Sequence, residues 1–310
     1  MKHSDDRSAP LRPAHFEYPA EDTVLEVVDL SKRFVAKHRS ADGSHSHPVI
    51  RAVDGISFQL RKGEILGIVG ESGCGKTTTG KMIMRLLEPS GGTIAFEGRV
   101  LEAENQAALK EYRRKVQMIF QDPYASMNPR FRIQDVLEEP LLIHKSGENR
   151  NERMQMVKEV LGKVKITPAE DYMSRHPHML SGGQRQRIAT ARTLILSPKV
   201  IVADEPVSMI DLSTRAEILH MMKAVQHDMG LSILYITHDI STARFFTNRL
   251  VVMYLGAIVE IGPTGNLIDE SAHPYTQALI AAVCEPDAGK QNSPKDVPIK
   301  GEIPSAANIP

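Results

Sequence analysis

A glycine-rich stretch, GESGCGKTT, has the residue types that bind phosphate. Its order, Gly-x-x-x-x-Gly-Lys-Thr, is the P-loop pattern, and a strand-like segment precedes it while a helix-like segment follows. The glycines let backbone N–H groups turn inward, Lys76 is predicted to reach the β- and γ-phosphates, and the Thr77 hydroxyl is predicted to bind Mg²⁺. The predicted members of this nucleotide site are Gly70, Glu71, Ser72, Gly73, Cys74, Gly75, Lys76, Thr77 and Thr78.

Two acidic residues end a second apolar segment, KVIVADEP. An acid at the carboxyl end of a buried strand beside a P-loop holds Mg²⁺ directly or through water, and Asp204 has this position. Glu205 follows and is placed to orient or deprotonate the attacking water. The alternative is that both acids merely cap a strand, and the presence of Lys76 weakens that alternative.

Two more polar residues end apolar segments. Gln121, before Asp122 and Pro123, could bind Mg²⁺ or position water, and a solvent-facing glutamine is the alternative. His238 ends LSILYITH and could contact the γ-phosphate, whereas a hydrogen-bonded core histidine is equally consistent with its position. Neither residue is decisive by itself.

The stretch LSGGQRQR, Leu180 to Arg187, carries a serine and two glycines in front of a helical pattern. A helix N-terminus prepared in this way binds anions. The stretch has no strand, lysine or acidic pair of its own, so it predicts a second and incomplete phosphate site.

Strand-like and helix-like segments alternate along the chain and must position these residues. Near-continuous apolar strands between helices predict a largely parallel α/β core. Strands are expected at 24–35, within 50–70, at 93–101, 115–121, 199–206 and 231–239, and as a hairpin at 249–262; helices are expected at 77–88, 213–230 and 273–283, with a mainly helical block at 132–193.

The composition narrows the function classes. The 310 residues contain 38 Lys and Arg against 38 Asp and Glu, so no global basic field suggests a nucleic-acid partner. Of the two cysteines, Cys74 lies inside the phosphate loop, so we expect no structural disulfide with Cys284 and a reducing compartment. No apolar run approaches the roughly 18 residues that span a bilayer, and the polar N-terminus does not read as a secretion signal.

A polar loop carries the only group of histidines that suggests a metal site. His38, His45 and His47 lie within ten residues of one another. No cysteine or acidic cluster nearby completes a closed site, so solvated histidines are the expected interpretation.

The order of P-loop, Gln121, LSGGQ, Asp204-Glu205, Ser208-x-x-Asp211 and His238 resembles the nucleotide-binding subunit of ABC transporters, over roughly residues 24–276. The resemblance implies that Phe34 stacks on adenine, Gln121 is the Q-loop glutamine, Ser208 to Asp211 is the D-loop, and His238 is the switch histidine. It also implies that Ser181, Gly182, Gly183 and Gln184 contact the γ-phosphate of ATP held by a partner's P-loop.

The resemblance further implies a P-loop NTPase core with a mainly parallel sheet, an N-terminal antiparallel β subdomain and an inserted α-helical subdomain. The expected division is a mobile tail at 1–23, an ABC ATPase domain at 24–262 with its helical subdomain at about 122–190, and a C-terminal extension at 263–310.

Three stretches, FQDPYASMNPR, HPHMLSGGQRQRIATAR and HPYTQALI, are similar to the oligopeptide/dipeptide importer group, which also serves nickel and, in some lineages, oligosaccharides. The D-loop reads SMID instead of the usual SALD, and the P-loop ends in KTT instead of KST, but the functional hydroxyls and Asp211 are kept. The GEIP motif lacks the cysteine cluster often found beyond it, so no iron–sulfur group is expected.

The sequence therefore predicts an Mg²⁺-dependent ATPase subunit of an importer at the cytoplasmic face of the membrane. The implied partners are a second ATPase subunit, usually a paralogue, two permease subunits and, indirectly, an extracytoplasmic solute-binding protein. A soluble ABC ATPase of DNA repair or translation would show coiled-coil insertions or two P-loops. A non-hydrolysing subunit is the other alternative, against which Glu205, His238 and the intact LSGGQ argue.

Overall fold

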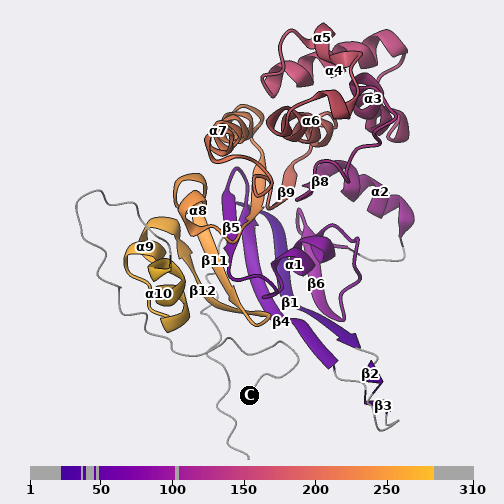
Figure 1. The fold of residues 1–310 in the computed structure, drawn as a ribbon. Helices are drawn as coiled ribbons and strands as arrows, with labels where there is room; N and C mark the ends of the chain where they lie inside the picture. Colours follow the sequence, from indigo (N-terminus) through magenta and orange to yellow (C-terminus); the bar gives the residue numbers. More distant parts are fainter. Residues whose placement is uncertain (1–21, 36–37, 40–44, 47–48, 102–104, 283–310) are drawn as a thin grey trace, which may run out of the picture.

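The central sheet supplies the frame of the molecule. The computed structural model describes residues 22–35, 38–39, 45–46, 49–101 and 105–282, without the side chains of 38–39 and 45–46 (Figure 1). Parallel pairing joins β11, β5, β10, β9 and β8, and only β12, at one edge, pairs antiparallel. The strand order in this sheet is β12 (Ala257–Pro263), β11 (Arg249–Tyr254), β5 (Ile65–Val69), β10 (Ser232–Ile236), β9 (Val200–Asp204) and β8 (Val116–Ile119).

The strands of this sheet are apolar on both faces, as strands of a covered parallel sheet must be. In β10, Ile233 and Tyr235 pack into one hydrophobic core, whereas Leu234 and Ile236 pack into the other. This alternation explains why the sequence shows continuous apolar runs in place of an apolar–polar alternation.

A second sheet is antiparallel and packs on one face of the first. Its order is β4 (Val49–Arg61), β1 (Thr23–Val35), β6 (Gly91–Phe96) and β7 (Arg99–Val100). Leu25, Ile56 and Ile94 from this sheet share one core with Leu66 and Val202 of the parallel sheet. A short pair, β2 (His38–Arg39) and β3 (His45–Ser46), lies beyond its end (Figure 1).

The helices divide into a group beside β8 and a set that covers the central sheet. Figure 1 shows α3 to α6 together at one end of the molecule, opposite β1 and β4. None of the described helices is long and apolar enough to cross a membrane. The helices are α1 (Lys76–Ile83), α2 (Gln106–Lys115), α3 (Ile133–Ile143), α4 (Arg150–Lys163), α5 (Ala169–Met173), the 3-10 turn η2 (Pro177–Met179), α6 (Gly182–Leu194), α7 (Leu212–Met229), α8 (Ile240–Phe246), α9 (Thr264–Asp269) and α10 (Pro274–Ala281).

Most of the expected elements are found, with one wrong boundary. The helix after the P-loop was expected to reach Glu88, but α1 ends at Ile83, because Arg85 takes a left-handed backbone with φ 52°. Helices α2, α8 and α9 were not anticipated. Several expectations fall outside the described residues: those on His47, Cys284 and the GEIP motif. The expected tail at 1–23 also lies outside them, apart from Asp22 and Thr23.

Candidate functional site

The phosphate loop connects β5 to α1 and depends on glycine at two points. Gly70 has φ 149°, and a Cβ there would lie 2.2 Å from the Met253 carbonyl oxygen. Gly75 is the N-cap of α1 with φ 107°, and a Cβ would lie 2.3 Å from the Ala52 oxygen. Any larger residue at either point would displace backbone, so the glycines fix the path of the loop.

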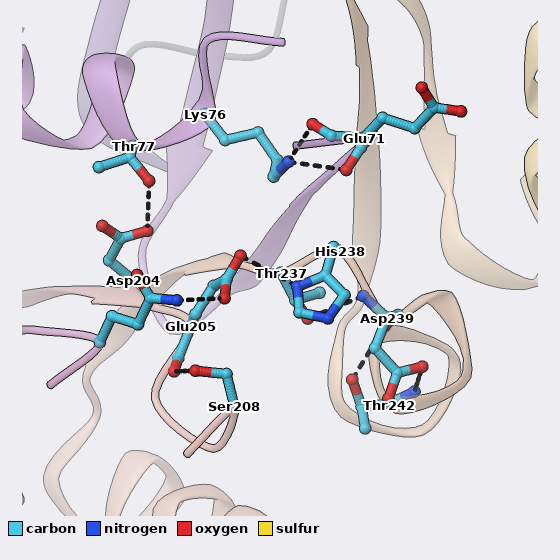
Figure 2. A network of polar contacts seen from close by, with 12 residues as sticks. Glu71, Lys76, Thr77, Asp204, Glu205, Ser208, Thr237, His238, Asp239 and Thr242 are labelled. Atoms are coloured by element: carbon cyan, nitrogen blue, oxygen red, sulfur yellow. Dashed lines mark hydrogen bonds and ion pairs between the residues drawn. The ribbon is translucent and has the colours of Figure 1, made fainter. Parts of the chain in front are cut away.

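Lys76 lies in the middle of this loop and is only 5% exposed. Its ammonium Nζ donates to the carbonyl oxygens of Gly70 and Glu71, both at 2.7 Å (Figure 2). The Cys74 Sγ lies 3.6 Å from the same nitrogen, and burial raises the pKa of that thiol. Two neutral carbonyls hold the ammonium, so an entering phosphate would provide a stronger, charged acceptor.

Thr77 and Asp204 meet at the carboxyl edge of the sheet. The Thr77 hydroxyl donates to Asp204 Oδ1 at 3.0 Å (Figure 2), and burial raises the pKa of that carboxyl, opposed by this hydrogen bond. Among the described residues no group of three His, Cys, Asp or Glu side chains could hold a metal by itself. One carboxylate and one hydroxyl fit Mg²⁺, which is usually bound by one or two protein ligands together with phosphates and water.

Glu205 has a left-handed backbone, with φ 45°. Its side chain is held on both oxygens (Figure 2): Gln121 Nε2 donates to Oε2 at 2.8 Å, and His238 Nδ1 lies 3.0 Å from Oε1. A strained backbone of this kind persists only where surrounding contacts impose it, and such residues concentrate at functional sites. Gln121, Glu205 and His238 thus form one cluster that the sequence did not predict as a unit.

Strand order explains why these three residues meet. Gln121 follows β8, Glu205 follows β9 and His238 follows β10, and these strands are parallel neighbours in the sheet. The carboxyl ends of parallel strands lie at one edge, where α/β proteins bind ligands. Two local contacts fix the end of β10: the Asp239 N–H donates to the Thr237 hydroxyl, and the Asp239 carboxylate caps α8.

The segment from Ser208 to Asp211 lies between Glu205 and α7. The Ser208 hydroxyl donates to the Glu205 carbonyl at 3.0 Å (Figure 2). Asp211 caps α7 by accepting from Ser213 Oγ and Thr214 N–H, which lowers the pKa of its carboxyl to about 2. Arg215 was not anticipated: its guanidinium donates to the carbonyls of Ile210 and Ser208 and so holds the segment in place.

The serine–glycine stretch begins α6, away from the phosphate loop of its own chain (Figure 1). Ser181 and Gln184 form a capping box: Ser181 Oγ accepts from Gln184 N–H, and the Gln184 side chain accepts from Ser181 N–H. Gly183 lies against α7, where a Cβ would approach Thr214 Cγ2 to 2.5 Å. Ser181 and Gly182 are exposed, so this end of α6 is presented to the exterior.

Phe34 lies near the end of β1 and is 40% exposed. The Lys32 ammonium lies 5.4 Å from the centroid of its ring. Among the described residues, no hydrogen bond or ring contact joins Phe34 to the phosphate loop or to the Glu205 cluster. Its free ring face is compatible with stacking on a flat ligand.

Tyr275 is a contact of the phosphate loop that the sequence motifs did not indicate. Its hydroxyl accepts a hydrogen bond of 3.0 Å from the Glu71 backbone N–H, although 204 residues separate them. The only signal in the sequence was the HPYTQALI stretch, which marks a family group but does not indicate a contact.

The chain is similar to known proteins over most of its length. Two family models match the chain: ABC transporter over residues 53–208, and Oligopeptide/dipeptide transporter, C-terminal region, over residues 259–310. The chain is 43% identical over 293 residues to the oligopeptide transport ATP-binding protein AppF of Bacillus subtilis, covering 94% of this chain and 87% of the relative. It is 39% identical over 294 residues to the dipeptide transport ATP-binding protein DppF of Escherichia coli, covering 95% and 86%.

Solved structures show the same fold. cbiO1 from Clostridium perfringens, part of the ABC transporter complex cbiONQ, aligns with a TM-score of 0.67 and 26% identity over 81% of this chain and 92% of that one. The dimeric, post-hydrolysis ATP-binding cassette MJ0796 with bound ADP and Pi aligns with a TM-score of 0.66 and 25% identity, over 77% and 98%.

Proposed function

The chain belongs to the family of ABC transporter ATP-binding subunits, and on this premise we propose that it is the ATP-hydrolysing subunit of an importer for oligopeptide-like solutes. The observation that carries the proposal is the Glu205 carboxylate, held between Gln121 and His238 beside the Thr77–Asp204 pair. This arrangement places a potential base next to a phosphate loop, as hydrolysis of a γ-phosphate requires.

The roles of the individual residues follow from their contacts. Lys76 exchanges its two carbonyl acceptors for the β- and γ-phosphates. Thr77, Asp204 and Gln121 are proposed ligands of Mg²⁺, which supplies charge neutralisation at the transferred phosphoryl group when bound. Glu205 orients the attacking water and accepts its proton, while His238 holds the carboxylate and offers its other ring nitrogen toward the γ-phosphate side.

A complete site requires a second subunit. Ser181 to Gln184 start a helix whose N–H groups attract anions, yet they lie apart from Lys76 in the same chain. We propose that they contact ATP held by the P-loop of the partner, and that the Ser208–Asp211 segment lies at the same interface. A paralogous subunit is the proposed partner, because the importer group usually pairs two different ATPases.

The division of the chain is proposed to follow the same family pattern, with an ATPase domain at 24–262, a helical subdomain at about 122–190 and an extension at 263–310.

Between the central sheet and α3 lies a cavity of about 230 Å³ next to the Q-loop. Its wall includes Phe120 and Ile143, which are 40% and 55% exposed. We propose that a short cytoplasmic segment of a permease docks here, so that movement of Gln121 is transmitted to it.

The proposed location is the cytoplasmic face of the membrane, through contact with two permease subunits. The solute reaches the permeases from an extracytoplasmic binding protein, and its identity is set by those chains. Peptides are the proposed solutes, and nickel or oligosaccharides are the alternatives within the same importer group.

Two measurements test the proposal. Together with its partner ATPase subunit, the wild-type chain is expected to release phosphate from MgATP, whereas Lys76→Ala is expected to lose ATP binding and Lys81→Ala, on the exposed side of α1, to keep it. Co-expression with a pair of permease subunits is expected to give a membrane complex, which Ile143→Glu disrupts without loss of phosphate release. Recovery of the chain only with DNA or ribosomes, or an assembled wild-type complex that binds but never hydrolyses ATP, would contradict the proposal.

A further inference from the structure

We propose that Tyr275 is a positioning residue of the phosphate loop, acting through the hydrogen bond from the Glu71 N–H to its hydroxyl at 3.0 Å. The proposal rests on the nucleotide-binding function proposed above. It joins two regions that match separate family models, since Glu71 lies in the ABC transporter match and Tyr275 in the C-terminal match.

The tyrosine is fixed before any ligand binds. Its ring is 4% exposed and packs against Tyr254, with ring centroids 4.3 Å apart and planes at 40°. It belongs to a small hydrophobic core with Val69, the last residue of β5, and Leu267 of α9. Figure 1 shows α9 and α10 together beside β12, at the edge of the molecule where this core lies.

The start of α10 is anchored by polar contacts as well. His273 caps the helix, because its Nδ1 accepts from the Tyr275 N–H at 3.1 Å. The Glu260 carboxylate of β12 accepts from the backbone N–H groups of Ala272 and His273 at 2.9 and 3.3 Å. The hydroxyl of Tyr275 is therefore held in place both by the packing of its ring and by its backbone.

The peptide group between Gly70 and Glu71 is the point where this anchor meets the nucleotide machinery. Its N–H, that of Glu71, donates to Tyr275, while its carbonyl, that of Gly70, accepts from Lys76 Nζ at 2.7 Å. The Glu71 carbonyl, on the next peptide group, accepts from the same Nζ at 2.7 Å and from Cys74 N–H at 3.3 Å. On the same side, Gly256 N–H donates to the Cys74 carbonyl at 3.0 Å. The β11–β12 hairpin and α10 thus hold two successive parts of the loop.

This arrangement gives Tyr275 a role that depends on the ligand. When phosphate oxygens take over the Lys76 ammonium, the Gly70 carbonyl loses its charged donor, and the hydrogen bond from the Glu71 N–H to Tyr275 remains to hold the Gly70–Glu71 peptide group in orientation. Without the hydroxyl, the peptide can rotate and the loop must be ordered again on binding. A single hydrogen bond of this kind corresponds to about a threefold to tenfold change in an equilibrium constant.

The test compares Tyr275→Phe with Tyr254→Phe in the full chain. Both substitutions keep an aromatic ring at the contact, but only the first removes the acceptor of the Glu71 N–H. We expect Tyr275→Phe to raise the KM for MgATP and the Kd for a non-hydrolysable ATP analogue by about three- to tenfold, with kcat within about twofold of wild type. Tyr254→Phe is expected to leave KM, Kd and kcat unchanged.

A second measurement begins with the wild type. Residue-resolved hydrogen exchange of the nucleotide-free wild type is expected to show a protected Glu71 amide, because the N–H is bonded to a buried hydroxyl. In Tyr275→Phe this protection is expected to fall while the protection of α10 stays. An unprotected Glu71 amide in the wild type overturns the proposal whether or not the variant folds.

The remaining outcomes separate this proposal from the proposed function. If wild type and Tyr254→Phe bind MgATP and Tyr275→Phe binds it equally well, the role of Tyr275 is refuted and the ATPase function stands. A fall in melting temperature with unchanged KM and Kd likewise reduces Tyr275 to a packing residue. If the wild type does not bind MgATP, the proposed function itself fails.

Discussion

His238 Nδ1 lies 3.0 Å from Glu205 Oε1, while Gln121 donates to the other oxygen of the same carboxylate. The three side chains follow three adjacent parallel strands, so the sheet itself sets their separation. A carboxylate held at both oxygens has little rotational freedom left, and it can meet a water molecule at the phosphate without reorganising.

We expect Glu205→Gln to lower kcat for ATP hydrolysis by about 100-fold or more, because the amide cannot accept the proton of the attacking water. ATP binding should be kept, since no phosphate-loop contact is removed. Phosphate release and equilibrium binding of ATP measure the two effects. Glu170→Gln, at an exposed position of α5, is the control and should behave as wild type. Unchanged hydrolysis by Glu205→Gln would remove Glu205 from the mechanism.

Because the start of α6 is exposed, we expect a substitution there to affect dimerisation but not ATP binding. Ser181→Arg should leave ATP affinity of the isolated chain within about twofold, because surface changes away from a site have small effects. It should nevertheless block ATP-dependent dimerisation, since a large side chain would occupy the space of the partner's γ-phosphate. Size-exclusion chromatography in a Glu205→Gln background measures the dimer.

The control for this experiment lies at the other end of the same helix. Ser197 is exposed just beyond α6, and its left-handed backbone, with φ 50°, is no worse for arginine than for serine. Ser197→Arg should therefore dimerise normally. Loss of ATP binding by the Ser181→Arg monomer would show that the stretch belongs to the site of its own chain.

We expect the buried carboxylate of Asp204 to lower the stability of the nucleotide-free fold while it serves Mg²⁺-dependent hydrolysis. Burial raises the pKa of its carboxyl, so above this pKa the folded state carries the cost of a desolvated charge. Asp204→Asn should raise the melting temperature of the nucleotide-free chain at pH 7.5, and it should abolish Mg²⁺-dependent hydrolysis. The hydrogen bond from Thr77 can be kept by the amide oxygen.

The gain in melting temperature from Asp204→Asn is expected to change with pH in one direction. As pH falls through the raised pKa, the folded carboxyl takes up a proton before the unfolded one does, and the cost disappears from the wild type. The advantage of Asp204→Asn should therefore shrink as the pH is lowered from 7.5 through this raised pKa. Asp228→Asn, with a side chain that is 77% exposed, should show no such trend. A gain that grows on acidification would contradict the assignment.

We expect Phe34 to contribute to recognition of the adenine base of ATP. We expect Phe34→Ala to raise the Kd for ATP by about tenfold, since base–aromatic stacking is worth about 1–3 kcal/mol. Phe34→Tyr should bind as wild type does because it keeps the ring. Val35→Ala, at the next and more exposed position of β1, is the matched control in the same binding titration. Equal affinities for all four proteins would exclude adenine stacking at this residue.

The fold was predictable where neighbouring residues decide the conformation. The P-loop follows from closely spaced glycines and Lys76, because the backbone path of the loop is a local property. The parallel sheet follows from continuous apolar runs such as residues 200–203, which only a strand covered on both faces requires. Local signals were weaker for α1, whose end at Ile83 depends on the left-handed Arg85 and not on the helical pattern that continues to Glu88.

By itself, the sequence determined the chemistry available to this protein: a lysine in a glycine loop, two acids after a buried strand, and a serine–glycine helix start. Only the tertiary structure decided which groups meet. Glu205 lies between Gln121 and His238 because β8, β9 and β10 are neighbours, and strand order is not written in any one segment. Tyr275 reaches Glu71 for the same reason, because packing brings α10 to the phosphate loop although the two residues are 204 positions apart in the sequence.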